Sequence, residues 1–169
     1  YGDYPRMSFD GDTYSLTLDR EELREIIDRT AFATSQEDSR PMLTGALFEL
    51  GENLTVVATD AYQFAMRTLP LKTPAEEHRC IIPTKAMQEI SRMTDETEAD
   101  EVQILFTRSH VRVAVDHAAL IARLISGDYI PYRNILPKES KTRVLANRED
   151  LIRAVDLAQV MAREGSNSI

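Results

Sequence analysis

The chain has 169 residues, of which 43% are hydrophobic and 28% charged, and its formal net charge is −8. That length allows one complete domain with a sizeable core and leaves a remainder. The sequence has no apolar run near the ~20 residues of a membrane span and no signal segment, so we expect a cytoplasmic protein with no membrane partner. Its acidic balance argues against tight, sequence-independent binding of nucleic acid, which needs concentrated Lys and Arg.

The first element is predicted after an irregular opening segment. Residues 1–12 combine Tyr, Pro, Gly and Asp without periodicity, which is typical of a linker. Alternating apolar residues over 13–18 predict a half-buried strand. Asp19 then has the position of a helix N-cap with Glu22 three residues later, and an apolar stripe predicts a helix to about Thr34.

Strand-like stretches follow this helix, and the same order of elements then recurs. Short turns join residues 43–50, 54–59 and 64–69, which predicts an antiparallel meander. Pro83 stands at a second helix start, where its missing N–H costs little, and an apolar stripe extends to about Met93. The remaining predicted strands of this second half are residues 79–82, 102–107, 111–115 and 118–125. The fold class is therefore α+β, a duplicated β-α-β-β-β unit with two helices packed on antiparallel sheet.

A second repetition lies at longer range. Residues 18–31 resemble residues 146–159: Arg20 matches Arg148, and Asn147 takes the cap position of Asp19. Chance similarity between two amphipathic helices is the alternative. The resulting division is a linker from a missing first domain at 1–12, a domain at 13–126, a connector at 127–141, and the first strand and helix of a further, truncated copy at 142–169.

Four short motifs stand out along the chain: Arg-Pro-Met-Leu-Thr-Gly at 40–45, Val-Ala-Thr-Asp at 57–60, Pro-Thr-Lys at 83–85, and Gly-Asp-Tyr at 127–129 followed by Leu-Pro at 136–137. They occur in the order and spacing of the middle domain of bacterial sliding clamps, the beta subunits of DNA polymerase III. The sequence therefore resembles this family over nearly its whole length.

This resemblance implies the DNA-clamp fold: a head-to-tail homodimeric ring whose subunits each hold three copies of one domain, with helices lining the hole. It implies a processivity factor without enzymatic activity or cofactor. Such a ring encircles duplex DNA loosely and tethers the polymerase catalytic subunit, the clamp loader and repair proteins. This piece alone is expected to be monomeric.

One face of the second predicted helix carries the first candidate site. Lys85, Gln88 and Arg92 lie opposite its apolar stripe, and the resemblance implies that this face points at DNA phosphates. The alternative is a solvated helix face. On the first helix acidic residues stand beside the arginines and nearly cancel their positive charge. The loop at 35–38 stands where the family has a loop that touches DNA, but this loop is acidic. The candidate DNA-facing residues are Lys85, Gln88, Arg92, Arg24, Arg29 and Arg153, with Arg163 comparable to Arg153.

The resemblance also implies a groove into which client proteins insert a short motif ending in bulky apolar residues. Gln63 and Phe64 stand where family members commonly have Arg-Leu, and Asn134 stands where an Arg is frequent, so client preference is expected to differ. Core packing is the alternative for the apolar members. The candidate groove residues are Leu43, Thr59, Ala61, Tyr62, Gln63, Phe64, Ile130, Asn134 and Ile135.

Two other classes of function compete with a clamp. Asp60, or the acidic residues Asp95, Glu96, Glu98, Asp100 and Glu101, could serve a metal-dependent hydrolase as acid, base or cation ligands. That cluster lacks EF-hand spacing, and the single cysteine and isolated histidines show no ligand pattern, so neither a metal site nor a catalytic residue is predicted. The second alternative is an interaction module that is not part of a ring.

Overall fold

The computed structural model describes residues 13–137 and 139–162. The expected linker at 1–12, and Arg163, lie outside the described residues. The chain divides between Ile130 and Pro131 into two compact units. Among the described helices, none is both long and apolar enough to cross a membrane.

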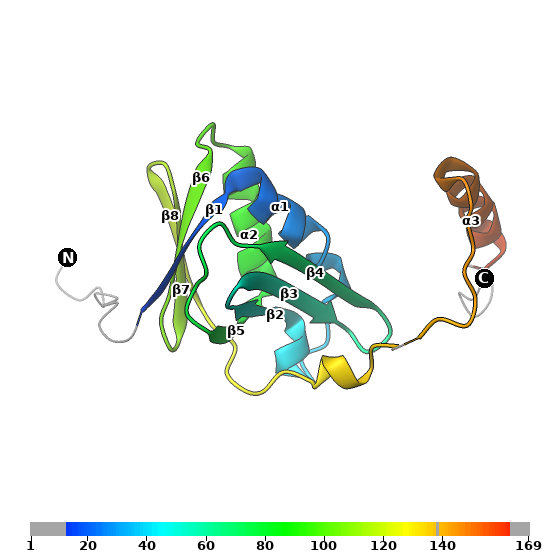
Figure 1. Cartoon of the computed structure of the whole chain (residues 1–169), viewed down its shortest axis with the longest axis horizontal. Coiled ribbons are helices and arrows are strands. Elements are labelled where there is room, and N and C mark those ends of the chain that lie inside the picture. The colour runs from blue at the N-terminus through cyan, green and yellow to red at the C-terminus, as the bar shows by residue number, and fades with distance from the viewer. Residues whose placement is uncertain (1–12, 138, 163–169) are drawn as a thin grey trace. The chain divides into compact units, whose positions relative to one another are not determined.

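The first unit contains the predicted order of elements twice (Figure 1). Its first half consists of β1 (Tyr14–Asp19), α1 (Arg20–Asp28), β2 (Gly45–Leu50), β3 (Asn53–Thr59) and β4 (Phe64–Pro70). Its second half consists of β5 (His78–Pro83), α2 (Thr84–Asp95), β6 (Glu101–Phe106), β7 (His110–Val115) and β8 (Ala118–Arg123). The predicted duplication is confirmed.

The two halves exchange their first strands. One four-stranded sheet has the order β1-β6-β7-β8 and the other has the order β4-β3-β2-β5, with every pairing antiparallel. Thus Leu16 of β1 pairs with Ile104 of β6. The two sheets meet at an isolated bridge, where the Ile125 amide donates to the Ile81 carbonyl at 2.9 Å.

The two helices lie side by side and antiparallel. Along α1 from Arg24 to Asp28, the partners on α2 run backwards from Asp95 to Ser91: Arg24 Nη1 lies 2.6 Å from Asp95 Oδ1, and Ser91 Oγ donates to Asp28 Oδ1 at 3.1 Å. Their buried faces form one core with the inner faces of both sheets. Central members of this core are Leu23, Ile26, Ile27, Met87, Ile90, Phe48 and Phe106.

The first helix is shorter than predicted, and its own side chains explain both ends. Asp19 Oδ1 accepts from the Glu21 amide at 2.8 Å and the Glu22 amide at 3.2 Å, which confirms the predicted N-cap. The helix ends at Asp28 and not near Thr34. Thr30 Oγ1 donates to the Ile26 carbonyl at 2.7 Å, a local bond that competes with the regular helical pattern.

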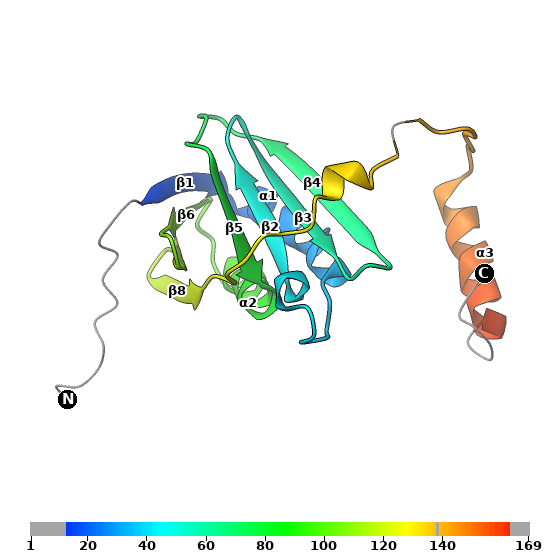
Figure 2. The ribbon, with the colours of Figure 1, turned by 90° about the horizontal axis from the view of Figure 1, so that it is seen from below.

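The outer face of the sheet β4-β3-β2-β5 is partly covered by residues 124–130, which cross it after β8 (Figure 2). Leu47, Val57 and Ile81 are buried on that side, so β2 is apolar on both faces. A Cβ at Gly45 would overlap the Ile82 carbonyl oxygen and lie 2.9 Å from Ile125 Cδ1. Glycine at this position therefore lets the neighbouring backbone approach.

The second unit contains a 3₁₀ turn at Tyr132–Asn134 and α3 at Arg148–Ala162. Asn147 caps α3 as predicted, because its Oδ1 accepts from the Glu149 amide at 2.9 Å. The strand expected after Thr142 is not formed in residues 142–147. In the first unit the corresponding strand, β1, depends on pairing with β6, and no such partner is present among the described residues of the second unit.

His78 joins the two sheets at the start of β5. Its ring stacks on Tyr14 of β1 with centroids 4.1 Å apart, and the Phe106 ring lies 5.8 Å away. The Nε2 atom is buried without a hydrogen-bond partner in the part of the chain that is described. Burial lowers the pKa of His78 below 6.5, because the charged imidazolium would lose its solvation.

Folding stability should therefore fall as pH drops from 7.5 towards 5.5. The unfolded state binds a proton near pH 6.5, whereas the folded state binds it only at lower pH, so stability is lost as pH falls from that value through the folded pKa. Urea unfolding at the two pH values measures this, and His78→Phe should remove most of the change while keeping the stack. His117→Gln, at an exposed turn, is the control and should leave the pH dependence of stability unchanged. If His78→Phe also left that dependence unchanged, His78 would not be its cause.

Candidate nucleic-acid and peptide interfaces

The exposed face of the helix pair carries most of the predicted DNA-facing residues. Lys85, Gln88 and Arg92 are all exposed on α2, and the side chains of Arg24 and Arg29 on α1 are 47% and 64% exposed. Arg153 lies on α3 in the second unit, where it is exposed and 3.9 Å from Asp150. The structure therefore brings together the predicted residues of α1 and α2 but does not relate Arg153 to them.

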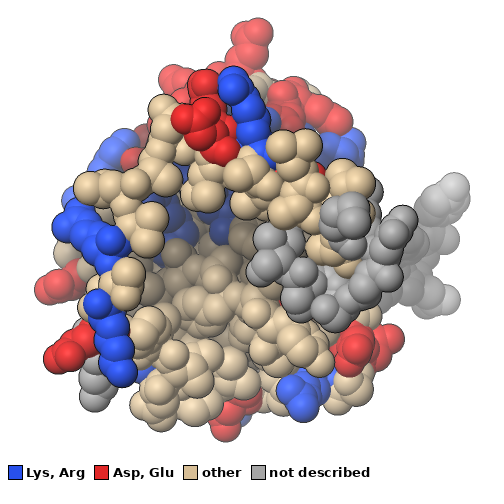
Figure 3. All heavy atoms as spheres, turned by 90° about the vertical axis from the view of Figure 1, so that its right-hand side faces the viewer, with Lys and Arg blue, Asp and Glu red and all other residues tan. Residues whose placement is uncertain are grey.

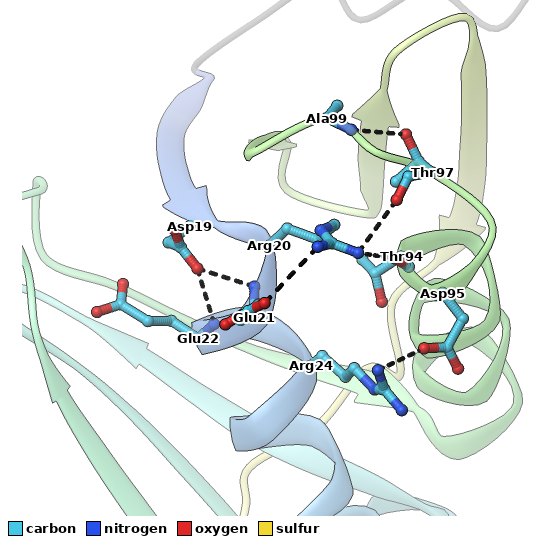
Figure 4. Close-up of polar contacts among 9 residues, drawn as sticks. All are labelled: Asp19, Arg20, Glu21, Glu22, Arg24, Thr94, Asp95, Thr97 and Ala99. Atoms are coloured by element: carbon cyan, nitrogen blue, oxygen red, sulfur yellow. Dashed lines mark hydrogen bonds and ion pairs between the residues drawn. The ribbon is translucent and has the colours of Figure 1, made fainter.

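Carboxylates of the same two helices already pair with the arginines of this face. Arg24 contacts Asp95 and, at 3.6 Å, Asp28, and Arg29 Nε lies 2.8 Å from Glu25 Oε1 (Figure 4 shows the Arg24–Asp95 pair). Each such exposed pair stabilises the fold by only about 0.2–1 kcal/mol. Their more important effect is that a carboxylate offsets the positive charge of each of these arginines at the surface.

Arg92 shows the same compensation within α2. Its guanidinium forms an ion pair with Glu89 and another, at 2.8 Å, with Glu96. The hydrogen bond from Arg92 lowers the pKa of Glu89, and Glu89 raises the pKa of Arg92, so both remain charged. Lys85 differs, because it forms no ion pair with any described residue. Figure 3 draws another side of the chain, where Lys and Arg in blue and Asp and Glu in red are both visible.

Arg20 adjoins this face at the start of α1. Its Nη1 donates to the Thr94 and Thr97 carbonyls, both at 3.1 Å, and so satisfies the C-terminal end of α2 (Figure 4). Its backbone amide donates to the Asp100 carbonyl at 2.8 Å. Arg20 therefore fixes the start of α1 against the end of α2, and only the match to Arg148 singled it out in the sequence.

The second candidate site centres on the β3–β4 hairpin. Asp60 Oδ1 accepts from the Tyr62 amide at 2.8 Å and the Gln63 amide at 2.6 Å, while Thr59 Oγ1 donates to the Gln63 carbonyl at 2.6 Å. Ala61 has φ of 80°, a left-handed conformation that costs a non-glycine residue energy. This bonding holds the loop in one shape and projects Tyr62, which is 97% exposed.

Asp60 has a structural role in this loop. The Gln63 and Tyr62 backbone amides hold the pKa of the Asp60 carboxyl below its usual value, because they stabilise the anion. A carboxylate engaged in this way is a poor general base. In the acidic run that begins at the end of α2, Asp95 is paired with Arg24. The described residues contain no group of three or more His, Cys, Asp or Glu side chains that could hold a metal ion.

An apolar surface adjoins the hairpin on the outer side of its sheet. Thr59 is buried and pairs with the half-buried Phe64, and the next pair on the same face is Val57 with Met66, which is 45% exposed. Leu43 is buried in the 3₁₀ turn Pro41–Thr44 that leads into β2. Leu43 is therefore packed in the interior, as the alternative to a groove role predicts.

The connector supplies the remaining groove candidates. Ile130 is half-buried at the end of the first unit. Burial raises the pKa of the nearby Tyr129 to about 12, and the Thr59 backbone opposes that shift, so this segment reaches the end of β3. In the second unit Asn134 is exposed and Ile135 is 61% exposed. The structure groups the five predicted hairpin residues and does not place Asn134 and Ile135 relative to them.

Comparison with known proteins gives a consistent result. Residues 17–131 match the family model for the central domain of the DNA polymerase III beta subunit. A beta sliding clamp of Halalkalibacterium halodurans is 31% identical over 99% of this chain and 45% of its own length. The crystal structure of the DNA polymerase III beta chain from Streptococcus pneumoniae aligns with a TM-score of 0.88 at 28% identity, over 98% of this chain and 44% of that one.

A sliding-clamp structure from Bacillus subtilis also aligns with a TM-score of 0.88, at 28% identity over 96% of this chain and 43% of that chain. The chain thus spans a little under half the length of the relatives it matches. Its fold is that of these proteins.

Replacing Ala61 with glycine should stabilise the protein by about 1 kcal/mol, because glycine adopts positive φ without the clash that alanine suffers. Urea unfolding of the variant and the parent measures the difference. Ala119→Gly, on the exposed part of β8, is the matched control and should lose about 0.5–1 kcal/mol. Equal destabilisation by the two substitutions would show that the loop does not hold Ala61 in this conformation.

Proposed function

This chain belongs to the DNA polymerase III beta subunit family, and on that premise we propose that it forms part of a sliding clamp, a ring that encircles duplex DNA and tethers the replicative polymerase. The observation that most supports this proposal is the antiparallel helix pair, whose exposed arginines already form ion pairs with carboxylates of the same two helices. A duplex beside such a surface would be held loosely, as sliding requires.

In this proposal the chain contributes one complete domain and the start of another. Residues 13–126 correspond to the central domain, residues 127–141 to an interdomain connector, and residues 142–169 to the beginning of a third domain. The apolar side of α3 supports this, because Leu151 is 55% exposed whereas its counterpart Leu23 is 1% exposed. Two whole subunits would close the ring as a homodimer.

Contact with DNA is assigned to the exposed face of α1 and α2. Lys85 is the strongest candidate, because its ammonium has no competing carboxylate among the described side chains and stands in the first turn of α2. Arg24, Arg29 and Arg92 would have to exchange an intramolecular partner for a phosphate. Such an exchange has little net driving force, which favours transient contacts over a fixed register.

Client proteins are assigned to the β3–β4 hairpin and the apolar surface beside it. Phe64 and Met66 offer partly exposed apolar area, and the fixed loop presents Tyr62 with the Gln63 amide group next to it. Clients such as the polymerase catalytic subunit, the clamp loader and repair proteins would insert bulky apolar residues here. Gln63 brings no positive charge, so acidic flanks on a client would gain little at this position.

The role proposed is mechanical and not chemical. The protein would act in the cytoplasm on replicating DNA, raising processivity by preventing the polymerase from diffusing away. Effective concentration accounts for this effect, since a tethered enzyme rebinds its template far faster than a free one. No step in the proposal requires a cofactor.

Freeing Arg92 should strengthen DNA binding. The double variant Glu89→Gln/Glu96→Gln removes both carboxylates that pair with Arg92, and we expect roughly threefold tighter binding of a 30-base-pair duplex at low salt, measured by fluorescence anisotropy. Lys85→Gln should weaken binding and reduce the slope of log K against log salt by about 1.

The control is Glu76→Gln/Glu77→Gln, which makes the same change in net charge in the exposed segment before β5. If this control strengthens binding as much as the α2 variant, net charge alone governs affinity and the helix face has no special role.

Phe64→Ala should weaken binding of a fluorescent peptide ending in Leu and Phe by about tenfold, because a partly exposed aromatic wall is lost. Phe32→Ala is the matched control, since Phe32 is likewise an exposed aromatic residue, 65% accessible, but belongs to the 3₁₀ turn Ala31–Ala33 after α1 and not to the strands of the hairpin. Fluorescence polarisation gives both dissociation constants. Equal weakening by the two variants would remove the hairpin as the peptide site.

A further inference from the structure

We propose that the outer face of the sheet β1-β6-β7-β8 carries a docking surface for a short acidic peptide segment, formed by Arg108, Arg112 and Arg123. These three residues are called the arginine corner below. The inference goes beyond the clamp function and does not depend on it, because it stands on the charges and strand register of this chain alone.

Strand register places the arginine corner at one end of the sheet. Val111 and Val113 of β7 point into the core, so Arg112 between them points outward. Arg123 of β8 pairs with His110, which makes it a diagonal neighbour of Arg112 on the same face, with Cβ atoms roughly 7 Å apart. Arg108 belongs to the turn between β6 and β7 at this same end.

The guanidinium groups of the arginine corner have no ion pair or hydrogen bond with any residue that the structure describes. This sets them apart from Arg24, Arg29 and Arg92, each of which has a carboxylate partner. On a chain with a net charge of −8, three uncompensated arginines on one sheet end are an unusual concentration of positive charge. Their charges are therefore available to an external anion.

The same face is acidic at its other end, which limits the kind of anion that fits. Asp19 and Glu101 are paired across β1 and β6 there, and Asp100 precedes Glu101. The strands have six residues, so the two ends are separated by roughly 20 Å. A long polyphosphate running along the strands would meet these carboxylates, whereas a segment of a few acidic residues would not.

Aliphatic side chains next to the arginines favour a peptide over a phosphate. Leu105 and Ile121 flank Arg112 as its direct cross-strand neighbours, and Ile121 is 37% exposed. Across these three strands the outer face therefore presents an apolar, a cationic and again an apolar side chain, namely Leu105, Arg112 and Ile121. A complementary partner carries Asp or Glu side chains with an aliphatic residue beside them, so that burial of the aliphatic group adds to the charge pairing.

The test uses the full 169-residue chain and a fluorescein-labelled ten-residue peptide in which Asp-Glu pairs alternate with Leu. Anisotropy titrations at 50 and 150 mM salt should show binding that weakens with salt. Arg112→Gln/Arg123→Gln should raise the dissociation constant about tenfold. The matched control, Lys72→Gln/Arg143→Gln, removes the same charge from exposed positions elsewhere and should change it less than twofold. Circular dichroism confirms that both variants fold.

Four outcomes would overturn the proposal. The first is an absence of peptide binding, and the second is an equal loss in the control variant. The third is that a 20-nucleotide single-stranded DNA binds the arginine corner more tightly than the peptide does. The fourth is that sedimentation shows a dimer that Arg112→Gln/Arg123→Gln dissociates. The DNA and dimer results would assign the surface to nucleic acid or to a second copy of this chain. A failure here leaves the helix-face and hairpin experiments unaffected, since they use other residues.

Discussion

The exchange of first strands between the two halves is the constraint from which the rest of the structure follows. β1 completes the sheet of the second half and β5 completes the sheet of the first, so neither half can satisfy its edge hydrogen bonds alone. Each helix follows the exchanged strand of its half directly, and the two are therefore brought antiparallel beneath both sheets. Arg20 reinforces this arrangement by bonding the end of α2 from the start of α1.

This arrangement gives the protein two chemically different sides. The helical side is charged but compensated, since Arg24, Arg29 and Arg92 each have a carboxylate partner from their own helix pair. Such a surface can stay close to a polyanion without binding it in one register, which is what a sliding ring needs. The sheet side holds the features suited to specific contacts: the hydrogen-bonded β3–β4 hairpin with its exposed Tyr62, and the arginine corner. Under the proposed function an acidic protein can serve DNA, because a ring would enclose the duplex and would not need to bind it tightly.

Much of this fold could be predicted from the sequence because its signals are local. Period-two alternation located the strands, and the cap at Asp19 set a helix start that the structure confirms. The end of α1 was misplaced, since a single hydroxyl, that of Thr30, competes with the helix there. Strand exchange was beyond sequence reasoning, because it depends on pairing β1 with β6, more than eighty residues later. The ion pairs of the helix face and the positive φ of Ala61 arise only from the folded backbone, so the sequence named candidate residues without showing which cations are free.

Native-state amide hydrogen exchange tests the strand exchange most directly. If the two halves depend on each other, the hydrogen-bonded amides of β1 and β5 will exchange with the same free energy of opening as those of β3 and β7, in one cooperative unit. Opening of one sheet at a clearly lower free energy, while the other sheet remains protected, would show that the halves fold independently and would contradict the account.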